Sequence, residues 1–123
     1  MTDDNPYSQL ISLLEKLSFE LKAAQLWSEQ VPNASQLQSS QPFCCDTLAF
    51  EQWLQFVFIT RLSTMAKQKQ ALPQNILVSP MAEEVFSDPK QHVVIDTIAD
   101  IDELLSGTKV SRTWHVKNLN SAS

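Results

Sequence analysis

The central part of the chain contains its most apolar stretch, and a segment of this kind has to be covered on most sides. Between Trp53 and Ile59, six of the seven residues are apolar. Apolar side chains recur mostly at steps of three and four from Phe50 to Met65, which is the period of a helix and runs longer than a typical strand. We therefore expect a buried helix at the centre of the fold.

Both ends of this helix are marked by residues that suit helix termini. Asp46 and Thr47 have short side chains that can accept hydrogen bonds from the free amides of a first turn. Lys67 and Lys69 complement the free carbonyl groups of a last turn, and Pro73 follows. The sequence thus predicts a helix that begins at Asp46 and Thr47 and ends near these lysines.

Composition and local signals predict helices before and after this segment. The chain has one glycine and six prolines, whereas sheets with many tight turns need more glycine. An amphipathic first helix is expected from Pro6 to Trp27, with Asn5 as its cap. Residues 30–41 are rich in Ser, Gln and Asn and are expected to form a long loop.

Two proline pairs mark helix starts in the C-terminal half. Ser79-Pro80 is expected to open a short helix, and Asp88-Pro89 a last helix, with Gln91 in reach of the cap. Gly107 suits the positive φ of a helix C-cap. The expected fold is all-α, a four-helix bundle of three long helices and one short helix, with long loops.

Charge divides the chain into an acidic body and a basic end. The formal net charge is -5, and all 14 acidic residues lie at or before Glu103. We expect a helical bundle domain over 1–107 and a basic, flexible tail over 108–123. The negative charge disfavours broad binding to nucleic acid or to an anionic membrane.

The first residues of the sequence lack the basic start and apolar core of a signal peptide. No apolar run approaches the roughly 20 residues that span a bilayer. Two adjacent cysteines are too few for a disulfide framework, which agrees with a reducing compartment. A cytoplasmic protein is expected.

The cysteine pair could take part in chemistry in three ways. Cys44 and Cys45 could supply a nucleophile, part of a metal site or a vicinal disulfide, and Cys44 precedes a predicted helix start. A structural zinc site needs four ligands, and the chain offers only His92 and His115 as histidine partners. Because free cysteines are commonly buried, we expect a core or boundary position, with no metal and no cofactor.

The last predicted helix has an acidic side. Asp96 and Asp100 stand four residues apart, a spacing that could bind a cation, although a solvated acidic face is the commoner outcome. All four carboxylates of this helix are expected to face outward: Asp96, Asp100, Asp102 and Glu103. The basic end that follows interleaves cations with an aromatic side chain, a composition that can stack a base and neutralise phosphates: Lys109, Arg112, Trp114, His115 and Lys117.

The central helix offers the best candidate surface. Trp53 and Phe56 lie about 60° apart on a helix, while Phe58 lies about 140° or more from either, so the three cannot face one core. If Phe43 and Trp53 are partly exposed they form an aromatic patch of the kind that marks partner surfaces, and otherwise they are core. Arg61 either binds an anion or partner, or packs its stem and pairs with a carboxylate.

The sequence resembles the YqcC family in and around this helix. The matching residues are Leu26-Trp27, Gln41-Pro42-Phe43-Cys44, Asp46-Thr47, Trp53-Leu54-Gln55, Ile59, Arg61 and Leu72-Pro73. The resemblance covers about residues 7–106. It implies a small all-helical bacterial protein with no established enzymatic activity, associated with tRNA pseudouridine synthase C, beside whose gene the family is commonly found.

The family association does not imply the synthase activity itself. A pseudouridine synthase needs a catalytic aspartate on a mixed sheet that can hold a flipped uridine, and this chain has neither the length nor the strands. The tail after Gly107 and the second cysteine, Cys45, depart from the family pattern. The resemblance therefore implies no function for the tail or for Cys45.

Together, these observations predict a non-enzymatic protein-interaction module with tRNA pseudouridine synthase C as its first candidate partner. The expected contact surface consists of Gln41, Phe43, Asp46, Trp53 and Arg61. The alternative is a tRNA or RNA-binding protein that uses the basic tail. No membrane partner is expected, and the sequence leaves the oligomeric state open.

Overall fold

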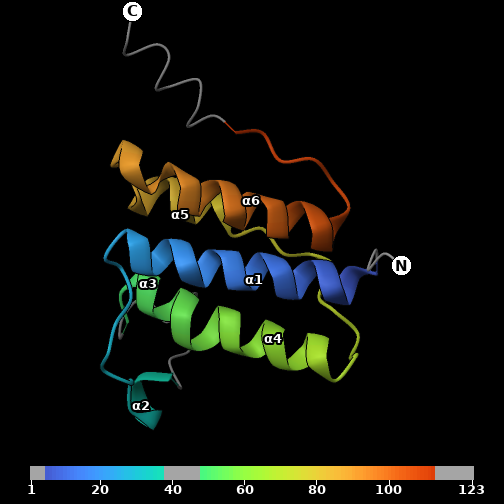
Figure 1. Ribbon diagram of the computed structural model, residues 1–123, viewed down its shortest axis with the longest axis horizontal. Helices are drawn as coiled ribbons and strands as arrows, with labels where there is room; N and C mark the ends of the chain where they lie inside the picture. The colour runs from blue at the N-terminus through green and yellow to red at the C-terminus, as the bar shows by residue number, and fades with distance from the viewer. Residues whose placement is uncertain (1–4, 38–47, 113–123) are drawn as a thin grey trace, which may run out of the picture. The chain divides into compact units, whose positions relative to one another are not determined.

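The computed structural model describes residues 5–37 and 48–112, and every regular element in these two ranges is a helix. The all-α prediction is confirmed. The chain divides into two compact units, Met1–Ala71 and Leu72–Ser123 (Figure 1). In the described residues, no helix is both long enough and apolar enough to cross a membrane.

The first unit is built on two antiparallel helices. Helix α1 (Pro6–Ala23) packs along a continuous helical rod formed by α3 (Phe50–Trp53), η2 (Leu54–Ile59) and α4 (Thr60–Lys67). At one end of this pair, the Tyr7 hydroxyl donates to the carbonyl oxygen of Lys69 at 3.4 Å. The buried face of α1 follows the ordinary helical alternation of four and three residues, with Leu10, Leu14, Leu17 and Leu21.

The predicted start of α1 is confirmed, and its predicted end is not. Asn5 Oδ1 accepts from the Ser8 amide at 2.8 Å, and Pro6 occupies the first turn. The helix ends at Ala23 rather than Trp27, because Gln25 takes a positive φ of 62° that no α-helix continues.

The segment expected to be a loop contains one helical turn, α2 (Ala34–Leu37). Asn33 and Gln36 close it reciprocally: the Gln36 amide donates to Asn33 Oδ1 at 2.9 Å, and the Asn33 amide donates to Gln36 Oε1 at 3.0 Å. Two orphan amides are thereby satisfied by side chains three residues apart. The prediction of a loop was therefore wrong for these four residues.

The central rod begins later than predicted. Its N-cap is Ala49, whose amide donates to the Gln52 side chain at 3.1 Å. The predicted caps, Asp46 and Thr47, lie outside the described residues. The predicted basic end is confirmed, since Lys67 stands in the last turn of α4.

One turn of this rod, η2, is a π-helix, and it changes how the aromatic side chains face. Trp53 stacks on Phe50 at a ring-centroid distance of 5.9 Å and contacts Phe58 at 5.4 Å. The prediction that Phe58 lies far around the helix from Trp53 was wrong. In a π-turn the hydrogen bond spans five residues, so side chains at i and i+5 come to the same side.

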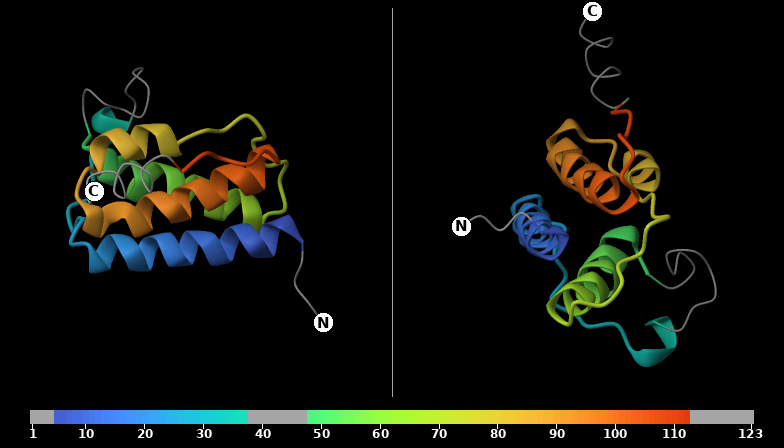
Figure 2. Two further views of the ribbon diagram at one scale, coloured as in Figure 1. Left: turned by 90° about the horizontal axis from the view of Figure 1, so that it is seen from above. Right: turned by 90° about the vertical axis from the view of Figure 1, so that its right-hand side faces the viewer.

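The second unit pairs α5 (Ser79–Val85) with α6 (His92–Ser106), and the 3₁₀ turn η3 (Pro89–Gln91) precedes α6 (Figure 2). The Asp88 cap is confirmed, because its carboxylate accepts from the Lys90 amide at 3.0 Å. Gly107 caps the other end with a φ of 74°, also as predicted. The apolar side of α6 is buried: Val94, Ile95, Ile98, Ile101 and Leu105.

The chain forms two compact units, and the assembly of their helices into a single four-helix bundle stays a prediction. The boundary between a 1–107 domain and a 108–123 tail also stays a prediction. Residues 108–112 belong to the described part of the chain, and their contacts with α6 are described below.

One buried amide side chain, that of Gln55, connects the central rod to the segment that follows α1. Gln55 is only 6% exposed. Its Nε2 donates to the Ser28 carbonyl at 2.8 Å, and its Oε1 accepts from the Ser28 amide at 2.8 Å. This side chain therefore satisfies both backbone groups of a residue that lies in the connection after α1.

We predict that Gln55→Leu lowers the free energy of unfolding by about 1–2 kcal/mol, because the half-buried backbone groups of Ser28 lose their partners while the volume is nearly kept. Urea unfolding followed by circular dichroism measures this. Gln68→Leu, at an exposed position after α4, is the matched control and should change stability by less than about 0.5 kcal/mol. Equal effects of the two substitutions would contradict the assigned role of Gln55.

Candidate functional site

The outer side of the central rod carries an open pocket of about 380 Å³. Its lining comes from three helical elements and one residue beyond the rod: Leu37 of α2, Phe56 and Val57 of η2, Thr60, Arg61, Thr64 and Met65 of α4, and Gln70. The pocket lies entirely within the first unit. It joins a predicted site residue, Arg61, to a wall of apolar side chains.

Arg61 supplies the charge of this pocket. The side chain is exposed, and the ion pairs found among the described residues do not include it. A guanidinium group offers five donors in a planar fork and has no acceptor. The pocket can therefore recognise a group that accepts hydrogen bonds and carries negative charge.

The structure separates the two predicted site residues that it describes. Trp53 is half-buried between Phe50 and Phe58 and does not line the pocket. The other three predicted residues, Gln41, Phe43 and Asp46, lie outside the described residues, as do Cys44 and Cys45. The expected surface is therefore described only at Arg61 and Trp53, which face different neighbours.

Sequence reasoning missed most of the pocket lining. Phe56, Thr60 and Thr64 repeat at four-residue steps, a spacing that places them along one side of a helix and that could have been recognised. Leu37 gave no such signal, because it belongs to the segment read as a loop.

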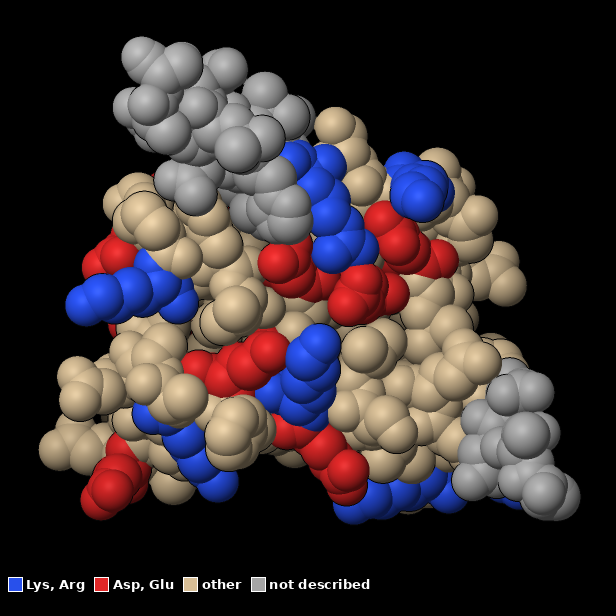
Figure 3. All heavy atoms as spheres, turned by 45° about the horizontal axis from the view of Figure 1, so that its top comes forward, with Lys and Arg blue, Asp and Glu red and all other residues tan. Residues whose placement is uncertain are grey.

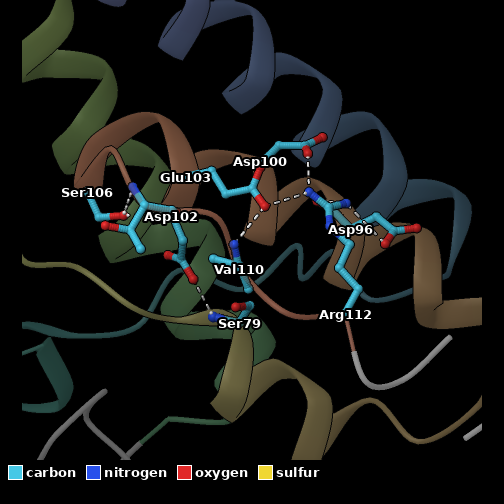
Figure 4. Close-up of polar contacts among 9 residues, drawn as sticks. Ser79, Asp96, Asp100, Asp102, Glu103, Ser106, Val110 and Arg112 are labelled. Atoms are coloured by element: carbon cyan, nitrogen blue, oxygen red, sulfur yellow. Dashed lines mark hydrogen bonds and ion pairs between the residues drawn. The ribbon is translucent and has the colours of Figure 1, made fainter. Parts of the chain in front are cut away.

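The second unit has a polar cluster on α6 centred on Arg112. Its guanidinium lies 2.6 Å from Asp100, 3.3 Å from Asp96 and 3.4 Å from Glu103. The Val110 amide also donates to Glu103 at 2.9 Å. Figure 4 shows these side chains converging on Arg112, and in the upper part of Figure 3 acidic and basic side chains lie side by side.

This arrangement changes two of the expectations for the acidic face. Asp96 and Asp100 do not simply form a solvated face, because Arg112 bridges them across their four-residue spacing. The alternative of a cation site receives no support, since the described residues contain no group of three or more potential ligands placed to hold a metal ion. Arg112 thus connects residues 108–112, the described part of the basic segment, to α6.

The pKa values follow from these contacts. The hydrogen bond from Val110, helped by Arg112, holds the pKa of Glu103 below its ordinary value. Partial burial alone would lower the pKa of Arg112, but the hydrogen bonds and charges of Asp100 and Glu103 raise it overall. Both groups therefore remain charged in the folded protein at neutral pH.

Asp102 points into the unit rather than outward, so its predicted exposure was wrong. It is fully buried, and its carboxylate accepts from the amides of Val78 at 2.9 Å and Ser79 at 2.8 Å. These amides are orphan donors at the start of α5. Asp102 rather than the predicted Ser79 side chain therefore caps α5, and Figure 4 shows it reaching toward Ser79.

Burial raises the pKa of Asp102 above its ordinary value of 3.8, and the hydrogen bonds from Ser79 and Val78 offset only part of this effect. The hydrogen bonds that define this cap are those from the two backbone amides to the Asp102 carboxylate.

The fold and the site define a small all-helical protein with a partly apolar, arginine-containing pocket. Residues 9–104 match the family model DUF446, whose description is tRNA pseudouridine synthase C. The chain is 30% identical over 95 residues to the uncharacterised protein YqcC of Escherichia coli, covering 76% of this chain and 87% of that protein. It belongs to the YqcC family, as the sequence motif predicted.

Two further comparisons place the chain within this family. An uncharacterised protein of Haemophilus influenzae is 37% identical over 75 residues, which cover 61% of this chain and 71% of that protein. The NMR structure of Escherichia coli YqcC superposes with a TM-score of 0.75 at 27% identity, covering 86% of this chain and 93% of that chain. The helical fold is therefore shared with a solved relative.

One relative is much longer. A tRNA pseudouridine synthase C of Pectobacterium carotovorum is 29% identical over 75 residues, which make up 61% of this chain but only 19% of that protein. The matched segment is thus about one fifth of the longer protein.

We predict that Arg112→Gln lowers the free energy of unfolding by about 1 kcal/mol at low salt, because partly exposed ion pairs contribute about 0.2–1 kcal/mol each. This loss of stability should be smaller in 1 M NaCl. At that ionic strength the Debye screening length falls to roughly 3 Å, so the ion pairs contribute less. Urea unfolding at the two salt concentrations measures both effects. Lys90→Gln, an exposed cation before α6, is the control; equal losses for both variants would contradict the cluster.

Asp102→Ala should lower the free energy of unfolding by about 2–3 kcal/mol, because two buried amides lose their acceptor. Glu84→Ala, on the exposed side of α5, should be nearly neutral.

A comparison of Asp102→Ala with wild type also tests the raised pKa of Asp102. The folded state holds this proton to higher pH than the unfolded chain, so the contribution of Asp102 to wild-type stability should fall as pH rises from 3.8 through the folded pKa. Asp102→Ala lacks this contribution, and its difference from wild type should be largest at the acid end. A difference that grows with pH would show that the pKa is lowered instead.

Proposed function

We propose that this chain is a non-enzymatic interaction module that binds tRNA pseudouridine synthase C. The observation that carries the proposal is the similarity to one fifth of a Pectobacterium carotovorum protein of that name. Covalent linkage keeps a module at high effective concentration beside the rest of its protein. Without such linkage, a module in the same role needs a binding surface that supplies this proximity.

The Arg61 pocket is the best-defined surface for such a contact. It combines an arginine with aromatic and aliphatic walls, a composition that is common at the energetic centre of protein interfaces. It also adjoins the π-turn η2, and π-turns occur frequently at functional sites. The proposal keeps Gln41, Phe43, Asp46 and Trp53 as further contact candidates, the four-helix bundle as the full fold, and a cytoplasmic location.

The alternative of RNA binding through the basic tail has less support. Arg112 is already engaged by three carboxylates, so much of its charge is unavailable to phosphate. With Arg112 engaged, the tail sequence has two remaining cations, Lys109 and Lys117. Because affinity for RNA grows with the number of phosphates neutralised, so small a charge gives weak and salt-sensitive binding.

We expect the chain to form a complex with the synthase of its own organism in the absence of tRNA, as measured by size-exclusion chromatography with light scattering. Truncation after Arg112 removes Trp114, His115 and Lys117 but keeps the Arg112 cluster, and it should leave the complex intact. Lys16→Glu, on the exposed side of α1, is the control for a nonspecific effect of charge.

Two results would count against this proposal. Co-elution only when tRNA is present, lost on truncation after Arg112, would support the RNA-binding alternative. No association with or without tRNA would remove the synthase as a partner.

A further inference from the structure

The pocket lies in a part of the sequence whose charge is opposite to that of the whole chain. Residues 52–82 contain no Asp or Glu, although the chain has 14 acidic residues and a net charge of -5. The cations of this stretch are Arg61, Lys67 and Lys69. Apart from Glu51 in its first turn, the charged side chains of the central rod are therefore the cations Arg61 and Lys67.

The shape of the pocket suits a peptide side chain with its backbone. Phe56 and Met65 are nine residues apart on one helical rod, which corresponds to about 13 Å of length. Leu37, which is 38% exposed, stands on the α2 side. The volume of about 380 Å³ lies at the lower end of the range of roughly 300–1,000 Å³ for binding pockets.

We propose that this pocket binds an acidic and apolar segment of a partner protein. One large apolar side chain of the segment fills the space against Phe56, Val57 and Met65, and a carboxylate one helical turn or less away pairs with the Arg61 guanidinium. The inference rests on the proposed function, in that the partner is a protein. It goes further by naming the chemistry of the segment that is recognised.

One physical argument favours this occupant over an RNA strand. A carboxylate and a phosphate both match the planar fork of a guanidinium with two parallel hydrogen bonds, so the apolar walls decide between them. A base could stack on Phe56, but the aliphatic wall of Leu37, Val57 and Met65 suits an apolar side chain better than the polar edges of a base. An acidic, apolar peptide satisfies both parts of the pocket together.

The test uses the full chain and a displayed library of random twelve-residue peptides, so it does not depend on the synthase. Selected peptides should carry Asp or Glu within four residues of Leu, Phe or Met, and their affinities are measured by fluorescence anisotropy. Arg61→Glu should weaken binding by about 30-fold or more, the equivalent of about 2 kcal/mol for a lost charge pair. Lys16→Glu should leave it unchanged.

A second variant blocks the pocket without changing its charge. Thr64 is exposed on α4 and lines the pocket, so Thr64→Trp should fill the space and abolish peptide binding. If circular dichroism shows that Arg61→Glu does not fold, the result for Thr64→Trp tests the proposal by itself. Failure to enrich acidic and apolar peptides, or affinities that neither variant changes, would overturn the proposal.

A photoreactive residue at position 64 identifies the occupant directly. Crosslinks to a selected peptide support the proposal. Crosslinks to a second copy, or to residues 38–47 of the same chain, that persist with excess peptide would assign the pocket to those occupants instead and overturn it. Peptide binding without synthase binding would refute only the proposed partner, whereas a synthase complex insensitive to Arg61→Glu and Thr64→Trp would refute only the pocket.

Discussion

The contact between Trp53 and Phe58 depends on one widened helical turn, and the rest of the first unit depends on that turn. Along the central rod the buried residues Phe50, Leu54, Phe58, Leu62 and Ala66 follow each other at a constant step of four. On a regular α-helix each such step advances by about 40° around the axis, so the row would spiral away from α1. The wider π-turn reduces this rotation around the axis and keeps the buried row on the side that faces α1. The residues opposite that row become the pocket wall.

Much of the fold was predictable, because its signals are local. The caps formed by Asn5 and Asp88 act within three residues, and Gly107 needs only its own backbone conformation. The contacts that the sequence did not reveal join distant positions: Gln55 reaches back 27 residues to Ser28, and Asp102 reaches back 24 to Val78. Nothing local distinguishes Asp102 from its half-buried acidic neighbours on α6, since its role is set by amides elsewhere. The same holds for the candidate site. The sequence alone pointed to Arg61, whereas only the tertiary structure places Leu37 beside it.

The charged groups of the second unit are mostly used within the unit. Asp102 satisfies two backbone amides at a cost in desolvation that raises its pKa. Arg112 joins three carboxylates of α6, so a residue that looked free to bind phosphate in the sequence serves to hold its own segment. The charges of α4 differ in kind, because Arg61 lies on an open pocket rather than in such a network. An exposed guanidinium stays hydrated in the free protein and has no desolvation cost there. Together with the apolar walls beside it, it offers a partner both directional hydrogen bonds and apolar contact.

The similarity to a segment of the longer Pectobacterium carotovorum protein bears on how strong a contact the proposed function requires. A module that is covalently linked to its partner can act through a weak contact, because linkage raises its effective concentration. A module that diffuses freely has to pay the full entropic cost of association at its surface. Under the proposed function, that surface needs a few residues that contribute strongly, rather than a large area. A pocket with one arginine, aromatic and aliphatic walls, and a surrounding stretch free of acidic residues meets this requirement on a helical unit of modest size.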